Sequence, residues 1–259
     1  MEYLDPAEAR TRPGLRLALT TGVPGPWGEA AKAVFHIKGL DYLPVRQTAG
    51  EENEALVEWT GHRNAPLAIL DDEPARAGWD EILHLAERLA PTPALIPATG
   101  HERALMFGLA NEICGEDGLG WNRRHQLLAP MLASPDAATN PALAAGRTLG
   151  GQYGWSPEAA ERANGRVCQI LSTFSDQLSA QKKAGSDYLV GDALSALDLY
   201  WATFSAMIEP MGPELNPMPE MMRAAYSTLT PEIAAVADPA LIAHRDFIYM
   251  KHLKLPLDF

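Results

Sequence analysis

The first regular pattern in the chain is an alternation of apolar and other residues over positions 15–20. Leucines occupy the odd positions, which is the period-two pattern of a strand with one buried face. A turn-rich segment follows, and Pro26 suits the first position of a helix because that position needs no N–H donor. Apolar residues at helical spacing continue to Ile37, and Gly39 is placed to end the helix. The pattern predicts a strand, a tight loop and a helix.

The start of this predicted helix has a chemical property of its own. The first N–H groups of a helix lack partners inside it, and they carry the positive end of the helix dipole. Such an end is a ready site for an anion. Two interpretations stay open at this point: an anion site, or simply the first strand and helix of an α/β domain.

The rest of the N-terminal half continues the alternation of strands and helices. The residue pattern predicts strands over residues 42–46 and 64–70, and helices over residues 51–59 and 79–89. A short fourth strand fits before the last of these helices. The expected order of elements is therefore βαβαββα.

A change of pattern marks the second half of the chain. Residues 91–100 contain three prolines and are typical of a linker. Beyond them the sequence has only helical patterns. We expect helices over roughly residues 101–114, 121–133, 157–182, 196–209, 219–228 and 239–253.

These patterns together predict an α+β protein. A polar arm covers residues 1–13, a domain with a sheet covers residues 14–90, and residues 91–100 link it to an all-helical domain over residues 101–259. The sharpest local motif lies in the helical part, where Ser195 is suited to cap a helix. Asp198 follows three residues later and can reach back to the N–H of the capping residue.

Composition narrows the possible partners. The formal net charge of −12 argues against a nucleic-acid or anionic-membrane partner, because both need a clustered positive field. Cys114 and Cys168 are the only cysteines, so we expect no disulfide framework, no CxxC motif and no metal site. The sequence has no evident targeting segment and no window apolar enough to cross a bilayer. A cytoplasmic location is therefore expected.

The chain resembles a known family, the glutathione transferases. The run Gly191-Asp192 followed by Ser195 and Asp198 is similar to the helix start in the helical domain of that family. The segment ending Lys38-Gly39-Leu40, the Ala65-Pro66 pair and the proline-rich crossover resemble its first domain. The resemblance implies a thioredoxin-like domain followed by an all-helical bundle domain. It also implies a homodimer that uses glutathione as a co-substrate and a small hydrophobic electrophile as its second substrate.

The resemblance also implies a glutathione site. In the family, the proline before the third strand follows a cis peptide bond, and the residue before it pairs with the cysteinyl part of glutathione, which here implies Ala65. The implied glutathione-binding residues are Pro26, Trp27, Asn64, Ala65, Pro66, Arg76 and Gly78.

The sequence departs from the family at positions 25, 77 and 78. Gly25 stands where a catalytic serine or cysteine is usual, and it has no side chain to serve that purpose. An acidic residue and a serine usually open the third helix, where this chain has Ala77 and Gly78. The candidates for activating a thiol are therefore the hydroxyls of Thr20 and Thr21, or a backbone N–H near Trp27, each of which can donate a hydrogen bond to a thiolate. The two threonines can equally be ordinary residues at the end of a strand.

The helical half supplies candidates for the electrophile pocket. Trp121 lies beside Arg123 and Arg124 in an aromatic and cationic cluster, which can line a ligand pocket or simply take part in packing and surface ion pairs. The expected electrophile pocket consists of Phe107, Asn111, Cys114 and Trp121.

The leading functional hypothesis is an enzyme that binds glutathione or a related thiol and promotes its attack on a hydrophobic electrophile. The alternative is a non-catalytic protein of the same fold that serves in binding or interaction. Dithiol redox chemistry is nearly excluded, because the segment from Gly25 to Gly28 contains no thiol.

Overall fold

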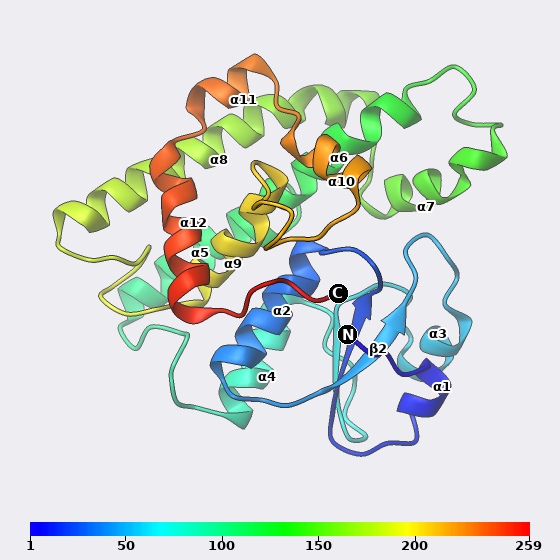
Figure 1. Ribbon diagram of the computed structural model, residues 1–259, viewed down its shortest axis with the longest axis horizontal. Helices are drawn as coiled ribbons and strands as arrows, with labels where there is room; N and C mark the ends of the chain where they lie inside the picture. Colours follow the sequence, from blue (N-terminus) through cyan, green and yellow to red (C-terminus); the bar gives the residue numbers. More distant parts are fainter.

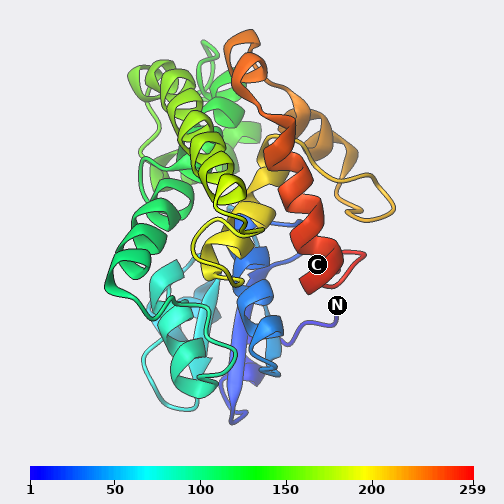
Figure 2. The ribbon, with the colours of Figure 1, turned by 90° about the vertical axis from the view of Figure 1, so that its left-hand side faces the viewer.

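The computed structural model describes residues 1–259, and its two regions differ in secondary structure (Figure 1). Residues up to 89 build a small sheet with helices on both faces, and the rest of the chain from residue 100 is helical. In both ribbon views the sheet lies below the helical region (Figures 1 and 2). This is the α+β architecture that the sequence predicted. No helix is both long enough and apolar enough to cross a lipid bilayer.

The sheet has three strands, β1 (Leu15–Thr20), β2 (Leu43–Gln47) and β3 (Leu67–Leu70). Strand β1 lies in the middle, parallel to β2 and antiparallel to β3. The expected fourth strand is reduced to a single bridge between Ala68 and Arg76. The intervening residues form a turn, and a proline in it has no N–H to offer a neighbouring strand.

Helices cover both faces of this sheet. Helix α2 (Pro26–Ile37) and helix α4 (Trp79–Leu89) pack on one face, against the leucines of β1. The short helices α1 (Pro6–Ala9) and α3 (Glu54–Thr60) pack on the other face, against the side chain of Ala18. The prediction of one buried face for β1 is therefore wrong, because the N-terminal arm and α3 cover its second face.

Arg16 shows how a charged residue is accommodated in that second face. Its side chain is only 2% exposed, and its two terminal nitrogens donate to the backbone carbonyls of Arg12 and Asp71. The guanidinium also lies 5.2 Å from the centre of the Trp59 ring. Carbonyl oxygens and an aromatic face thus replace water around the charge.

The helical region contains eight α-helices. They are α5 (Gly100–Cys114), α6 (Leu119–Leu132), α7 (Ala144–Gln152), α8 (Pro157–Lys183), α9 (Ala196–Phe204), α10 (Glu220–Ser227), α11 (Pro231–Val236) and α12 (Pro239–His252). Short 3₁₀ turns, Pro141–Leu143 and Ser205–Met207, precede α7 and follow α9. The predicted helix over residues 196–209 is thus shorter than expected.

The sequence pattern missed two of these helices. Helix α7 carries three glycines, which have poor helix propensity. One of them, Gly146, allows close packing on α6, because a Cβ there would lie only 2.1 Å from the sulfur of Met131. Helix α11 has only six residues, too few for a periodic pattern to stand out.

The predicted capping motif at the start of α9 is confirmed, and it does more than cap. Asp198 is fully buried and accepts hydrogen bonds from the N–H and the hydroxyl of Ser195, at 3.0 and 2.9 Å. Its other oxygen accepts the N–H of Leu189 at 2.8 Å and lies 3.0 Å from Nε2 of His244 on α12. One carboxylate thus joins the loop before α9, the start of α9 and helix α12.

A second buried polar group joins the sheet to the helical region. The side chain of Lys38, just after α2, is fully buried, and its Nζ lies 2.6 Å from the carbonyl of Pro93 and 2.6 Å from Oε1 of Glu87. Glu87 also accepts the N–H of Leu95 at 2.7 Å, and the carbonyl of Leu95 accepts the N–H of Ala196 at 2.9 Å. The proline-rich crossover is therefore bonded to the sheet region on one side and to the start of α9 on the other.

The role of Asp198 leads to a prediction about stability. Asp198→Ala leaves several buried donors without an acceptor, so the free energy of unfolding should fall by at least about 3 kcal/mol. The melting temperature should then drop by about 6 to 12 °C in a chain of this size. Ser195→Ala should cost only about 1 kcal/mol. Differential scanning calorimetry measures both changes.

The matched control is Asp176→Ala, which removes an exposed carboxylate without an ion pair from α8. It should change the free energy of unfolding by no more than about 0.5 kcal/mol. If Asp198→Ala melts within the range of this control, the carboxylate does not organise the three elements.

Candidate functional site

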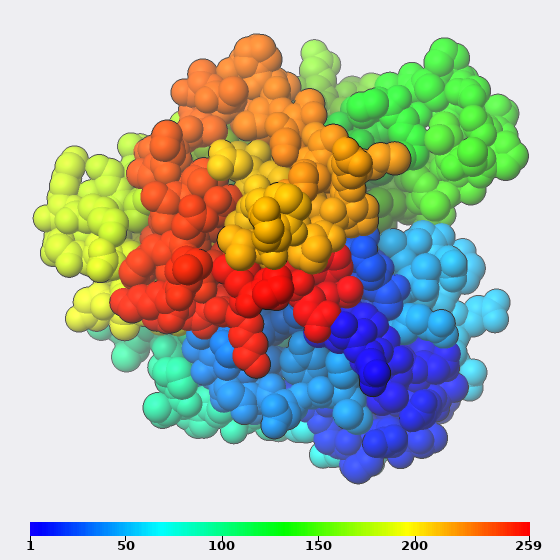
Figure 3. Space-filling view, in the orientation of Figure 1, coloured from blue at the N-terminus to red at the C-terminus, as the bar shows by residue number.

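A cleft with a volume of about 190 Å³ lies between the sheet and the helical region. The sheet side contributes the N-terminal end of α2, the end of β2 and the residues just before β3. The other side is formed by residues of α6, α7 and α10 and by the last residue, Phe259. In the space-filling view the C-terminal segment runs across the boundary between the two regions (Figure 3).

The start of α2 brings unpaired donors to this cleft. Gly25 is the N-terminal capping residue and provides no side-chain cap. Its carbonyl accepts the N–H of Glu29 at 2.9 Å, whereas the N–H groups of Trp27 and Gly28 donate to no other group of the protein. Gly25, Trp27 and Gly28 all line the cleft. The helix start, for which the sequence left open either an anion site or an ordinary first helix of the domain, thus lies beside a cavity.

The loop before β3 forms the facing part of the sheet side. Asn64, Ala65 and Pro66 line the cleft, and the Ala65–Pro66 peptide bond is cis, as the resemblance implied. Of the glutathione-binding residues expected from the sequence, the structure therefore brings Trp27, Asn64, Ala65 and Pro66 together. Pro26 is the buried first residue of α2 beside them.

The two expected hydroxyls differ in position. Thr20 lines the cleft, but its Oγ1 donates to Oε1 of Gln47 at 2.7 Å. The amide nitrogen of Gln47 in turn donates to the carbonyls of Thr48 and Arg63, at 3.0 and 3.3 Å. The amide oxygen is therefore the end of the Gln47 side chain that faces Thr20. Thr21 does not line the cleft, and its N–H donates to the carbonyl of Gln47 at 3.0 Å.

A third hydroxyl lies at the cleft, on a residue that no sequence pattern indicated. Tyr3, from the N-terminal arm, lines the same cleft, and its hydroxyl is sealed from solvent without a hydrogen-bond partner. Burial, followed by the nearby carboxylates of Glu29 and Asp258, raises the pKa of Tyr3 to about 12. The hydroxyl therefore keeps its proton at neutral pH and can donate it to a bound group. No pattern in the sequence places residue 3 beside α2.

The start of α4 lies outside the cleft. Arg76 pairs with Glu73 at 2.8 Å. The N–H groups of Ala77 and Gly78 donate to Oε2 of Glu81, at 3.0 and 2.9 Å. The bonds from Gly78 and then Ala77 hold the pKa of Glu81 below its ordinary value. This helix terminus is therefore already occupied by a carboxylate of its own chain.

Trp27 joins the start of α2 to the helical region. Its indole N–H donates to the carbonyl of Cys114 at 2.9 Å, and its ring lies 4.8 Å from that of Phe204 and 5.8 Å from that of Tyr153. The indole ring can lie this close to α6 because residue 120 is glycine, where a Cβ would lie 2.7 Å from the ring. The side chain thus forms a wall of the cleft.

None of the four residues expected for the electrophile pocket lines the cleft. Phe107 stacks on His84 with 5.5 Å between ring centres, and Asn111 lies against the backbone near Gly115. Cys114 is buried, which raises the pKa of its thiol well above the ordinary value. Trp121 lies behind the cleft.

The lining on the helical side is shifted by one layer from the expected pocket. Trp121 packs edge-on against Tyr153, with 4.7 Å between ring centres, and donates to the carbonyl of Tyr153 at 2.8 Å. Tyr153 then faces the cleft together with Arg124, Leu149 and Met222. Arg124 belongs to the aromatic and cationic cluster noted in the sequence. Tyr153 and Leu149 could not be anticipated, because α7 was missed.

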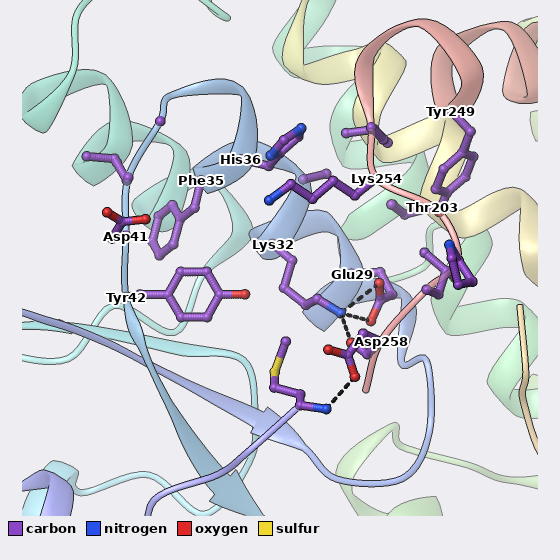
Figure 4. A pocket seen from close by; sticks show the side chains of 17 residues that line it. Glu29, Lys32, Phe35, His36, Asp41, Tyr42, Thr203, Tyr249, Lys254 and Asp258 are labelled. Atoms are coloured by element: carbon purple, nitrogen blue, oxygen red, sulfur yellow. Dashed lines mark hydrogen bonds and ion pairs between the residues drawn. The ribbon is translucent and has the colours of Figure 1, made fainter. Parts of the chain in front are cut away.

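A second, larger cavity of about 570 Å³ lies along the other side of α2 (Figure 4). Glu29 lines both this cavity and the cleft. Its carboxylate lies 2.9 and 3.1 Å from Nζ of Lys32, which also donates to the carbonyl of Asp258 at 2.6 Å. The amino group of Met1 pairs with the side chain of Asp258. These bonds fasten both ends of the chain to α2.

Comparison with known proteins gives a result at the level of structure only. No family model matches the chain, and no curated protein matches it. Among solved structures, a glutathione S-transferase from Methylobacterium radiotolerans in complex with glutathione sulfonate is 16% identical, with a TM-score of 0.60. The alignment covers 92% of this chain and 91% of that one. The chain has the glutathione transferase fold.

Two further structures share this fold. Rice GST1 in complex with glutathione is 17% identical, with a TM-score of 0.58 over 93% of both chains. A β-etherase from Sphingobium sp. strain SYK-6 is also 17% identical, with a TM-score of 0.56 over 89% of this chain and 99% of that one. Proteins with different titles thus share the glutathione transferase fold, so the fold alone does not identify a reaction.

The buried Glu29 leads to a prediction about pH. Burial raises its pKa above the ordinary value of 4.5, although Lys32 acts in the opposite direction. A raised pKa means that the carboxyl group stabilises the fold fully below 4.5 and loses this contribution as the pH rises through the folded-state pKa. The side chain of Glu29→Gln does not ionise, so the variant does not lose this contribution to stability as the pH rises. The melting temperature of the variant minus that of the wild type should therefore increase with pH above 4.5.

Thermal melts across a pH series provide the measurement. Glu54→Gln, at an exposed carboxylate on α3, is the control and should give a difference that does not change with pH. A flat difference for Glu29→Gln as well would mean that the ion pair with Lys32 fully compensates for burial.

Proposed function

We propose that this chain binds glutathione, or a related thiol, in the cleft and promotes attack of the thiolate on a hydrophobic electrophile. The observation that carries the proposal is the pair of N–H groups at Trp27 and Gly28, which have no partner within the protein and belong to residues that line the same cavity as Ala65. The glutathione-related ligands named for the Methylobacterium and rice structures support it. In the reaction the thiolate sulfur forms a bond to carbon, and the displaced group leaves with the bonding electrons.

Backbone donors can account for much of the activation. A thiol with a pKa near 8.5 needs about two units of lowering to be mostly ionised at neutral pH, or about 2.7 kcal/mol. The dipole of α2 supplies about 0.3 to 1 kcal/mol. A hydrogen bond to a charged group adds about 1.5 to 3 kcal/mol. The two free N–H groups can therefore replace the side chain that Gly25 lacks.

Hydroxyl donors complete the proposed site. Thr20 must give up its bond to Gln47, worth about 0.5 to 1.5 kcal/mol, for a charge-assisted bond worth about 1.5 to 3 kcal/mol. The exchange favours the thiolate by roughly 1 kcal/mol. Tyr3 has no such bond to lose. Thr21 does not line the cleft, so its only contribution to the site is to help hold the neighbouring Thr20 in place.

A second candidate function is non-catalytic binding, and two observations favour it. Glu81 occupies the helix terminus where the resemblance places the γ-glutamyl group. The cleft volume of about 190 Å³ is also below the range of about 300 to 1,000 Å³ that is usual for ligand sites, which favours one small ligand over a thiol and an electrophile together.

Assembly as a homodimer and a cytoplasmic location belong to the same proposal. Size-exclusion chromatography with light scattering tests the first of these.

The first test of the proposal restores the missing side chain. A Cβ at Gly25 meets no atom within 4 Å, and its φ of −61° and ψ of 125° suit any residue. Gly25→Ser should raise the turnover of glutathione with a reactive aryl halide by at least about tenfold, or about 1.4 kcal/mol. Gly25→Ala is the control and should leave turnover unchanged. Calorimetric titration with glutathione measures binding directly.

The outcomes separate the two functions. Glutathione affinity with turnover that Gly25→Ser increases supports the enzyme. Affinity without turnover in any variant supports the binding protein. An absence of heat at millimolar glutathione rejects both glutathione hypotheses.

The second test compares the hydroxyl donors. Tyr3→Phe and Thr20→Val should each slow turnover by about tenfold, or about 1.4 kcal/mol. Tyr3→Phe should not lower the melting temperature, because its hydroxyl has no partner. Thr20→Val should lower it, because Oε1 of Gln47 loses its donor. Thr20→Ser keeps the hydroxyl and should restore both properties.

Steady-state kinetics and thermal melts are recorded on the same samples, with Thr21→Val as the neighbouring comparison. If neither Tyr3→Phe nor Thr20→Val changes turnover, activation does not depend on a hydroxyl and must come from the backbone alone.

A further inference from the structure

Arg124 on α6 is a cation in the wall of the cleft without a counter-charge. It forms no ion pair, and its Nε is sealed from solvent without a hydrogen-bond partner. The residue as a whole is half-buried, and its terminal nitrogens are not among the sealed, unpartnered atoms. The charged end of the side chain is therefore accessible from the cleft.

The preceding residue shows what a structural arginine looks like in this chain. Arg123 is 2% exposed, and its Nε donates to the carbonyl of Met207 at 2.8 Å. One of its terminal nitrogens donates to the carbonyls of Tyr226 and Thr228, at 3.2 and 3.1 Å. Arg123 thus stitches two segments of the helical region together, whereas Arg124 does not.

The surroundings of Arg124 leave its charge in place. Burial lowers the pKa of its guanidinium, but the nearby hydroxyls of Tyr226 and Tyr153 raise it by more, so the net pKa lies above its ordinary value. The guanidinium carbon lies 5.9 Å from the centre of the Tyr226 ring. Neutral hydroxyls and an aromatic face accommodate a cation without cancelling it.

No other lysine, arginine or histidine lines the cleft, and Glu29 is the one carboxylate side chain that does. Glu29 is held by Lys32. Arg124 is therefore free to receive an anion from a ligand, within a chain whose net charge of −12 otherwise repels anions.

The remaining walls on this side are apolar or aromatic except for Gln152 of α7. The apolar and aromatic residues are Trp27, Leu149, Tyr153, Met222 and Phe259. A guanidinium presents parallel N–H donors that match a carboxylate or sulfonate. We propose that the second ligand of this cleft is an amphiphilic acid, whose apolar body contacts these walls and whose anionic head binds Arg124. This specifies the electrophile class of the proposed function and rests on that proposal, but the binding itself can be tested without glutathione.

The experiment uses two fluorescent probes that differ in one charge. Anilinonaphthalene sulfonate carries an apolar body and an anionic head, and N-phenylnaphthylamine is its uncharged counterpart. Arg124→Met should weaken binding of the sulfonate probe by at least about tenfold, or about 1.4 kcal/mol, and change binding of the neutral probe by less than about twofold. Arg124→Lys should restore part of the loss. Arg162→Met removes an exposed cation of α8 and should affect neither probe.

Two further measurements distinguish binding of an anionic head by Arg124 from a purely structural role of Arg124 in the cleft wall. The wild-type affinity for the sulfonate probe should fall as salt is added, and Arg124→Met should remove most of that dependence. Arg124→Met should melt close to the wild-type temperature, because Arg124 forms no ion pair that the variant would lose. Equal loss of both probes, with a lower melting temperature, would show that Arg124 only supports the wall and would overturn the proposal. No change with either probe would overturn it as well.

Calorimetry with glutathione completes the design. Arg124→Met should leave glutathione affinity within about twofold. A loss of glutathione affinity without a change for the sulfonate probe would assign Arg124 to the thiol site and reject the proposal. If glutathione binds neither protein while the probes behave as expected, the proposed thiol chemistry fails and the acid site stands.

Discussion

The docking of Trp27 into the helical region is the interaction on which the cleft depends. A single indole in the first turn of α2 donates to the end of α5 and packs against α9 and against Tyr153, after α7. Gly120 on α6 leaves the space for it. Because the ring lies in this position, the first turn of α2 is held beside the cleft that Trp27 and Gly28 line. Packing of one side chain thus positions the helix start on which the proposed site is built.

The N-termini of α2 and α4 differ in the residues that precede them. At α4, Oε2 of Glu81 accepts the N–H groups of Ala77 and Gly78. At α2, the N–H of Gly25 donates to the carbonyl of Val23 at 2.9 Å, and Glu29 pairs with Lys32. A carboxylate side chain of the protein therefore lies at the start of α4, whereas none caps the start of α2 beside the cleft.

Local patterns predicted most of the architecture, because periodicity and caps are local properties. The strand and helix of residues 15–40 and the Ser195–Asp198 cap follow directly from residue spacing. The predicted fourth strand is absent because the residues between Ala68 and Arg76 form a turn. Helix α7 was not predicted because its glycines have poor helix propensity, and Gly146 and Gly150 are there for close packing on α6.

The site was harder to predict than the fold for the same reason. Trp27 and Ala65 lie on elements that the sequence reveals. Tyr3, Tyr153 and Phe259 reach the cleft from segments far apart in the chain, and only tertiary packing brings them there. The residues expected for the electrophile pocket do not line the cleft, and one of them, Trp121, supports Tyr153 from behind.

The two anchors of α2 have a consequence for motion. Trp27 fixes one end of the helix to α5 and α9, and the buried Lys38 fixes the other end to the crossover. With both ends held, this helix cannot slide or tilt to admit a larger molecule. Extra room for a larger ligand must therefore come from the opposite wall, which residues of α6, α7 and α10 form.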